Sequence, residues 1–496
     1  MKQIILISVV FLLHLYIHAQ VANFSGFDSY LPINGGDINP ALNAESRGKW
    51  VFSPGRMDMN LTNNLFYLKM PYSPYKVIGK NVPSAYKTEN GNAYWDWSWF
   101  KMNSKTNVFN FQGISRNYGP SLILKKGKYY FSVRSEITAF VFCKGLPAGI
   151  IRDQVDNWNN SDGNSAPSTL LNSAFQYRNA TMYISQQVYS GVSFGVARKF
   201  KLKRSKDFSM GVNYRLLHSM GGYYLKVKTG NVEAENASHI KISAPSVYFA
   251  EMLPRNNIFW PHGKGGVDFG FVFTHRNTEC RRPGNYNGIH PDYKWKLGWS
   301  VLDIGRLMYT RTIVTNVAMK NDVSLPDPNG FIDKDPEEIL QDYRSIFQTE
   351  IGLENTMTYG KKVFVGLPTR SIFTADLQLS RHLFWGSMYM QNMRRTVKNN
   401  IFFASNFSTG LRAEFKYFGF SLPLNYAPSL NAATVGMGVR IGQLYFGTGN
   451  LAPFIHPNGN YAASFYFGIQ ITDLPGTVFR KKLPYMFSGR RSCAGF

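Results

Sequence analysis

Residues 293–309 read YKWKLGWSVLDIGRLMY. Over the first nine residues, apolar and polar side chains alternate, which places Trp295 and Trp299 on one face of an extended chain. Lys294 and Lys296 fall on the opposite face. A period of two residues predicts a β-strand with one apolar and one polar face. The alternation breaks at the Asp-Ile-Gly triplet 303–305, where an acid and a glycine fall on the face that had been apolar.

The same two-residue period recurs along the chain, at 129–141, 192–197, 208–216, 267–274, 373–380, 420–426, 435–441 and 465–471. Many of these stretches are longer than the five or six residues of a typical soluble strand. They approach the nine to eleven that a membrane strand needs. Because a closed barrel leaves no unpaired sheet edge in lipid, we expect an all-β, transmembrane antiparallel β-barrel of about 14–18 strands. The alternative is a large secreted β-sandwich or propeller.

Composition agrees with a strand-rich chain that contacts lipid. Aromatic residues make up 15% of the 496 residues, and charged residues only 17%, below the roughly 25% of soluble domains. The mean hydropathy of −0.23 argues against a helical membrane protein. The formal net charge is +25. In an exported protein this charge predicts anionic partners such as outer-membrane lipid headgroups, lipopolysaccharide phosphates or acidic solutes, and no nucleic acid.

The chain divides into four predicted segments. Residues 1–19 read as a cleaved signal peptide, because the apolar run from Ile4 to Ile17 is too short to span a membrane comfortably; an uncleaved anchor helix is the alternative. Residues 20–55 are expected to form an N-terminal strap or plug, and 56–471 the barrel. A basic C-terminal tail follows at 472–496. Further non-alternating segments at 144–179 and 320–350 are expected to be loops or short helices that cap or fill the barrel.

Catalytic motifs give little support for an enzyme. The G-x-S-x-G match at 191–195 lies inside an alternating strand, whereas a nucleophile elbow needs a sharp strand-to-helix turn. The nine histidines are scattered, and Cys143, Cys280 and Cys493 have neither zinc-like spacing nor the pattern of a disulfide framework. We therefore expect no enzyme activity, no cofactor and no metal; a lumenal hydrolase is the least favoured reading.

Five short motifs occur in a set order: NPALNAESR at 39–47, NNL at 63–65, LGWSVLDIG at 297–305, LPTR at 367–370 and IGQLYFGTGN at 441–450. Together they resemble an uncharacterised family of outer-membrane β-barrels from Bacteroidota. That family is distantly similar to fatty-acid-transporter-like barrels and to barrels associated with type IX secretion. The resemblance implies a barrel fold and a place in the cell outer membrane, and it supplies no substrate or catalytic residue. Arg306-Leu307 and the basic tail depart from the family pattern.

Two functional hypotheses follow. The first is a porin-like channel or transporter for anionic or amphipathic solutes, because the alternation predicts a lumen with basic side chains. These side chains are Arg134, Arg215, Lys294, Lys296 and Arg440. The second is a structural or partner subunit of an envelope machine, such as a type IX secretion or gliding apparatus, that contacts other envelope proteins through its loops or basic tail.

Two motifs carry structural expectations. Asn39-Pro40 disfavours helix at Asn39 and predicts an extended or turn entry, into either a plug or a strap that seals the barrel. Asp303 and Gly305 are expected to form a turn or bulge where the strand reaches the membrane surface. The return strand would then begin at Leu307 and Tyr309. One or both tryptophans of the stretch would belong to an aromatic girdle.

Overall fold

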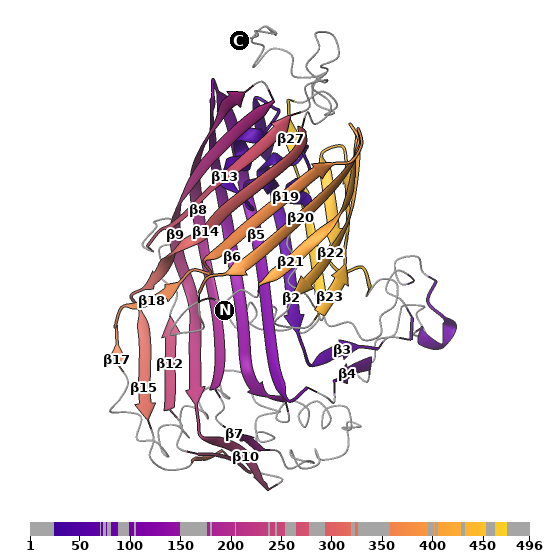
Figure 1. The fold of residues 1–496 in the computed structure, drawn as a ribbon. Coiled ribbons are helices and arrows are strands. Elements are labelled where there is room, and N and C mark those ends of the chain that lie inside the picture. Colours follow the sequence, from indigo (N-terminus) through magenta and orange to yellow (C-terminus); the bar gives the residue numbers. More distant parts are fainter. Residues whose placement is uncertain are drawn as a thin grey trace.

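A computed structural model of the chain shows a closed antiparallel β-barrel of 14 strands (Figure 1). The predicted fold class is confirmed. The structure describes residues 24–473, apart from 70, 73–75, 77–80, 88–98, 104–105, 149–175, 179–180, 204, 237–238, 244–245, 253–263, 277–292, 319–322, 326–357, 395–400, 402–404, 428–431 and 453–461. The predicted signal peptide, the helical stripe within 320–350 and nearly all of the basic tail lie outside these residues.

The wall is built from long and composite strands. They are β1 (Trp50–Ser53), β2 (Arg56–Asn63), β5 (Val108–Lys126), β6 (Tyr129–Pro147), β8 (Thr181–Lys203), β9 (Lys206–Lys228), β12 (Ser246–Met252), β13 (Gly266–Arg276), β14 (Tyr293–Tyr309), β15 (Thr312–Ala318), β17 (Thr358–Tyr359), β18 (Val363–Gly366), β19 (Arg370–Gln378), β20 (Leu383–Asn392), β21 (Asn406–Glu414), β22 (Phe418–Ala427), β23 (Ala432–Val435), β24 (Met437–Ile441), β25 (Leu444–Thr448), β26 (Ala462–Ile469) and β27 (Ile471–Thr472). The barrel closes where β2 pairs with β26, in the register Arg56↔Gly468, and where β1 pairs with β27.

Alternation along the strands separates the two faces of the wall. On β13 every second residue is buried, and on β8 Phe194 and Val196 are 49% and 46% exposed while Ala197 is buried. Large apolar side chains such as Phe373 and Leu424 are about half exposed on other strands. An outward apolar surface on a closed barrel is the arrangement that lipid requires.

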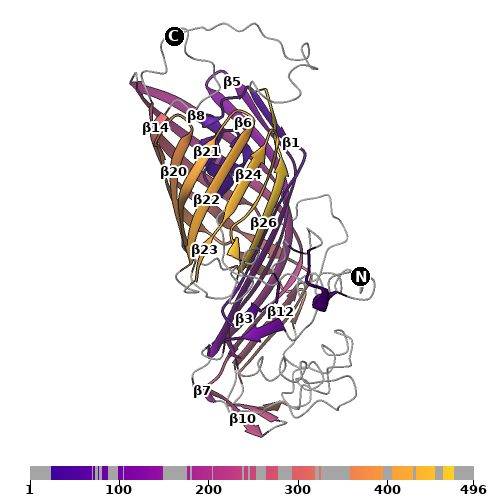
Figure 2. The same ribbon diagram turned by 90° about the vertical axis from the view of Figure 1, so that its right-hand side faces the viewer.

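The two ends of the barrel differ. At one end, here called the turn end, most neighbouring strands are joined by short turns such as the one from Lys126 to Tyr129, where Gly127 has φ +62°. At the other, the loop end, β8 and β9 of 23 residues each run well past β20 to β22, of 9 or 10 residues (Figures 1 and 2). Beyond that end lies a second sheet of β7 (Gln176–Arg178), β10 (Asn231–Asn236), β11 (His239–Ile242) and β16 (Val323–Leu325). A further hairpin pairs β3 (Phe66–Leu68) with β4 (Phe100–Met102), and η3 (Ser84–Tyr86) is a short 3-10 turn.

Strand β14 corrects the expectation drawn from its sequence. The chain does not turn back after Leu302, because β14 continues to Tyr309 and pairs there with β18. Val267 and Phe269 pair with Ile304 and Val301, so two β14 residues face one residue of β13. This is a β-bulge, and Asp303 in it has φ +59°. The bulge resets the alternation and buries Asp303 completely, so the acid avoids the lipid-facing side.

The N-terminal segment lies inside the barrel near the turn end. It consists of η1 (Phe24–Phe27), α2 (Pro32–Gly35) and η2 (Pro40–Glu45), and residues 24–46 are hereafter called the plug. In Figures 1 and 2 its short helices, in indigo, are enclosed by the strands. No helix among the described residues is long and apolar enough to cross a membrane.

Candidate functional site

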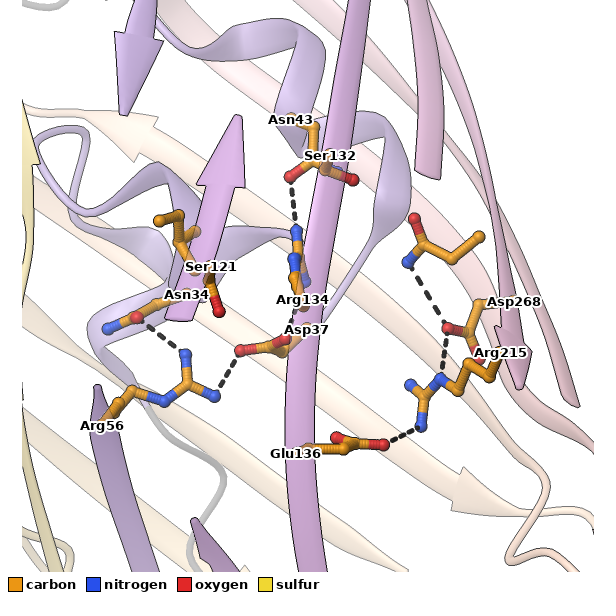
Figure 3. Close-up of polar contacts among 12 residues, drawn as sticks. Asn34, Asp37, Asn43, Arg56, Ser121, Ser132, Arg134, Glu136, Arg215 and Asp268 are labelled. Carbon is orange, nitrogen blue, oxygen red and sulfur yellow. Dashed lines mark hydrogen bonds and ion pairs between the residues drawn. The ribbon is translucent and has the colours of Figure 1, made fainter. Parts of the chain in front are cut away.

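A buried ionic clasp ties the plug to the wall. Asp37 of the plug binds Arg56 of β2 at 2.5 Å and Arg134 of β6 at 2.7 Å, and the two arginine side chains are only 3% and 6% exposed. The second arginine nitrogens donate to Asn34 and Asn43 of the plug at 2.8 and 2.7 Å (Figure 3). Each guanidinium therefore contacts two plug side chains, which fixes the plug in one position.

A second and a third clasp act at other points of the plug. Glu45 forms ion pairs with the ammonium of Lys199 at 3.0 Å and with a guanidinium nitrogen of Arg276 at 3.2 Å. Asp28 binds Arg440 at 2.9 Å. Each carboxylate comes from the plug and each cation from a barrel strand. Ion pairs therefore attach the plug to the wall along most of the plug's length.

Electrostatics keep these plug carboxylates ionised. Burial alone would raise the pKa of Asp37, but the charges of Arg56 and Arg134 hold that pKa below its ordinary value. Burial likewise opposes ionisation of Glu45, and Lys199 and Arg276 lower its pKa far below the usual range. Protonation of either acid would therefore weaken its hold on the wall.

The Asn-Pro motif sits against a patch of glycines in the wall. Asn39 donates from Nδ2 to the carbonyl oxygens of Phe271 and Trp299, at 3.0 and 3.2 Å, while its Oδ1 accepts from Ala41 N at 2.9 Å. A Cβ at Gly211 of β9 would overlap the Pro40 backbone, and one at Gly270 of β13 would overlap the Asn39 side chain. Glycine at these strand positions lets the plug backbone approach the sheet closely.

Arg215 of β9 organises a separate cluster within the wall. It binds Asp268 at 2.9 Å, Asp303 at 2.7 Å and Glu136 at 3.3 Å, and Figure 3 shows the contacts to Asp268 and Glu136. Arg370 approaches the other Asp303 oxygen at 3.3 Å. The acid in the Asp-Ile-Gly triplet thus belongs to a buried ionic network with residues from five strands, β6, β9, β13, β14 and β19.

Two larger cavities lie beside the plug, in addition to a smaller one beside Phe24 and Asp28. One, with about 90 Å³ of space for the centres of water-sized spheres, is here called the loop-side cavity, since the β19 residues that line it, Arg370 and Ile372, lie toward the loop end. The other, with about 60 Å³ of such space, is here called the turn-side cavity, since the residues of the same strand that line it, Thr374 and Asp376, lie farther toward the turn end. The two linings have no residue in common, and plug residues contribute to both.

The lining of the loop-side cavity has two chemical characters. One part is ionic and contains three arginines and two aspartates: Arg56, Arg116, Arg370, Asp37 and Asp58. Another part is apolar and is formed by Ile38, Ile114, Ile372, Met388 and Met390. Several of these apolar side chains also belong to the largest buried apolar cluster of the protein.

The five basic residues predicted to face the lumen have different settings. Arg134 and Arg440 are buried and hold the plug, and Arg215 is paired within the wall. Lys296 lies over the Tyr293 ring at 3.8 Å and lines the turn-side cavity. Lys294 differs from the other four, because the alternation shifts between Tyr293 and Trp295 at a bulge, which leaves Lys294 exposed at the strand end.

The sequence-based prediction missed most of the ionic partners. Arg56 and Arg370 face inward, as does Arg412, which binds Asp376 at 2.9 Å. The three arginines lie outside the alternating stretches found in the sequence. Asp376 lies inside one of them, 373–380. The in-strand glycines at 211 and 270 were an available signal, because glycine inside a strand often marks a close backbone approach.

Features that would suggest catalysis are not assembled. The G-x-S-x-G sequence lies in the middle of β8, without the turn that a nucleophile elbow needs. Among the residues that the structure describes, no group of three or more His, Cys, Asp or Glu side chains is placed to hold a metal ion. Cys143 is buried in β6, and Cys280 and Cys493 lie outside the described residues.

A closed barrel with an outward apolar wall and an ion-paired plug defines the class of protein: a plugged β-barrel of the outer-membrane type. The chain belongs to the family described as "Family of unknown function (DUF5723)", whose model matches residues 40–449. That range begins within the Asn-Pro motif of the plug and covers most of the barrel. No curated protein matches the chain.

Several solved barrels are similar in outline. A Pseudomonas aeruginosa FadL homologue has 9% identity and a TM-score of 0.39, covering 92% of this chain and 99% of that one. The Pseudomonas putida toluene transporter TodX has 9% identity and a TM-score of 0.29, covering 92% and 93%. The translocator domain of the autotransporter NalP from Neisseria meningitidis has 8% identity and a TM-score of 0.30, covering 90% and 99%. At these values the likeness assigns neither a solute nor a partner to this chain.

Proposed function

We propose that this protein resides in the outer membrane, after export by a cleaved signal peptide at 1–19, and carries amphipathic anionic solutes through its lumen. The observation that carries the proposal is the two-sided lining of the loop-side cavity. An ionic part rich in arginine lies beside an apolar part formed by isoleucine and methionine.

The lining selects a solute with a charged head and an apolar chain. A carboxylate or phosphate head group would pair with Arg116 and Arg370 through charge-assisted hydrogen bonds. An apolar chain would pack against Ile114, Met388 and Met390, where methionine adapts to different shapes. A neutral hydrocarbon would leave the arginines without a new partner, and a small inorganic anion would make no use of the apolar part.

Passage then requires the plug to move, and the clasp offers a way to couple movement to binding. Arg56 lines the loop-side cavity and also holds Asp37. An anionic head group that pairs with Arg56 competes with Asp37 for the same guanidinium. Solute binding would thereby weaken one attachment of the plug, and the solute would proceed toward the turn-side cavity.

Binding of a fluorescent probe tests this proposal. Purified barrel would be titrated with dansyl-labelled undecanoic acid and with its uncharged methyl ester. The acid should bind more tightly than the ester. Arg116→Gln should weaken acid binding by about tenfold, because a hydrogen bond to a charged group is worth about 1.5–3 kcal/mol, and should leave ester binding unchanged. Met388→Gln should weaken both.

Arg306→Gln is the matched control, since Arg306 is exposed and lies over Phe364 on the wall, outside the cavity lining. Equal binding of acid and ester, or equal effects of Arg116→Gln and Arg306→Gln, would contradict the proposal. Failure to bind either probe, together with co-purification of a stable envelope protein, would favour the alternative of a partner subunit in an envelope machine.

A further inference from the structure

Arg198 stands on the outer face of the wall. It follows Phe194 and Val196 at two-residue steps along β8, and both are nearly half exposed. Its neighbours across the sheet are Tyr129 and Met210, which are also exposed. An arginine is therefore fixed among side chains that face lipid.

The guanidinium of Arg198 lies over aromatic rings, and no acidic side chain that the structure describes pairs with it. Its central carbon lies 5.0 Å from the centre of the Tyr129 ring and 4.7 Å from that of Phe200. The Nε atom is buried and has no hydrogen-bond partner among the described residues. Cation–π contacts orient the group and leave the terminal nitrogens, rather than the buried Nε, to donate to an anion.

Two lysines extend the positive charge toward the turn end. Lys126 pairs across the sheet with Tyr129, and Lys206 begins β9 two residues before Phe208, on the outward side. Both lysines are exposed. The only acid of the segments 124–131 and 194–212 is Asp207, which is buried and binds Arg276. Lys126, Arg198 and Lys206 thus form an outward basic patch in which the described part of the chain places no carboxylate.

An aromatic band sets the depth of this patch in the membrane. Phe200 contacts Phe208, which contacts Phe271, which contacts Trp299, with ring centres 6.3, 5.9 and 5.2 Å apart. Such bands mark the level of the lipid headgroups. Short turns face the periplasm in outer-membrane barrels, so the patch at the turn end meets the periplasmic leaflet.

We propose that the basic patch binds an anionic phospholipid of the periplasmic leaflet. Its phosphate would accept hydrogen bonds from Arg198, which suits the planar guanidinium, with Lys126 and Lys206 adding charge at the rim. Its acyl chains would lie along Val196 and Met210. The site is distinct from the lumen and does not depend on which solute the barrel carries.

Native mass spectrometry of delipidated barrel tests the lipid site. The protein would be titrated with phosphatidylglycerol, with zwitterionic phosphatidylcholine and with lipid A. We expect wild-type protein to retain phosphatidylglycerol best. Each removed cation should weaken that binding about fivefold, as expected for one charge near a headgroup. Arg198→Gln should show this loss, and Arg198→Lys should recover part of it.

Arg381→Gln is the matched control, because it removes an exposed arginine from the β19–β20 turn at the same end of the barrel. Equal losses in Arg198→Gln and Arg381→Gln would overturn the proposal. Equal retention of phosphatidylcholine by wild-type protein would also overturn it, as would tighter binding of lipid A. These lipid preferences need no variant, so the proposal stays testable even where a substitution prevents folding.

Discussion

Replacing Asp37 by asparagine should release the plug. The Asp37 side chain is 19% exposed and pairs with two arginines that are almost fully buried. Breaking a buried ion pair by removing one partner costs about 3–5 kcal/mol. Arg56 would keep Asp58 at 3.3 Å, and Arg134 would keep Asn43 at 2.7 Å, so the low end of that range applies. About 3 kcal/mol corresponds to a ~150-fold shift in the equilibrium between seated and released plug.

A buried reporter in the plug can measure this shift. Ala44 is fully buried in η2, so Ala44→Cys, in a chain whose native cysteines are replaced by serine, should react with a maleimide only after the plug opens. If reseating is faster than labelling, the labelling rate follows the open population. Asp37→Asn should then label about 150-fold faster.

Asp58→Asn is the matched control for the clasp. Asp58 is about as exposed as Asp37 and faces the same Arg56, yet it belongs to the wall strand β2. Its replacement should speed labelling by less than about fivefold, the effect of one weak pair. Equal labelling of wild-type and Asp37→Asn protein, with both folded as judged by heat-modifiable gel migration, would refute the reasoning.

Three further outcomes are expected. Gly211→Ala places a Cβ against the Pro40 backbone and should weaken plug seating by about 1–3 kcal/mol; unchanged Ala44→Cys labelling would contradict this close approach. The lowered pKa values of Asp37 and Glu45 mean that their contribution is complete above the ordinary carboxyl range and is lost as pH falls through the lower folded values. Because the thiolate is the reactive form, the labelling rate at each pH is divided by that of the same cysteine in the unfolded chain; this ratio should be constant from about pH 7 to 5 and rise below about pH 4, and a ratio that rises with pH would contradict the sign. Asp303→Leu should impair barrel assembly more than Asp303→Asn. Asparagine tolerates the left-handed backbone at φ +59°, whereas leucine fits that backbone poorly and also removes the contacts to Arg215 and Arg370. Heat-modifiable migration measures this, and normal folding of the leucine variant would count against it.

The wall could be predicted from the sequence because its pattern is local. A two-residue period indicates which side chains face lipid. Trp295 and Trp299 accordingly contact the outward rings of Phe273 and Phe271. At Asp303 the bulge, one of the two predicted alternatives, is present, but the expected return strand is not, because β14 continues past the bulge to Tyr309. A second bulge, opposite His275 and Arg276, likewise places Lys294 and Lys296 in different surroundings.

The interior was harder to predict because its contacts join distant parts of the chain. Arg440 was expected to line a basic lumen, but its charge is matched by Asp28, 412 residues away. Arg134 is matched by Asp37 in the same way. A basic lumen inferred from the strands alone thus omits the acids of the plug. Asn39-Pro40 predicted either a plug or a strap that seals the barrel and did not decide between them, whereas the glycines at 211 and 270 mark where the plug backbone approaches the wall.

The most direct test of whether solute passes through the lumen when the plug moves is uptake into liposomes that contain barrel with its plug cross-linked to the wall. Asn43 Nδ2 and Ser132 Oγ lie 3.4 Å apart across the plug–wall contact, so cysteines at both positions, in the chain without native cysteines, can join plug to wall. Entry of dansyl-labelled undecanoic acid would be measured before and after reduction. We expect slow entry in the oxidised state and fast entry after reduction, with either single cysteine variant unaffected by reductant. Equal entry in both states of the double variant would contradict the account.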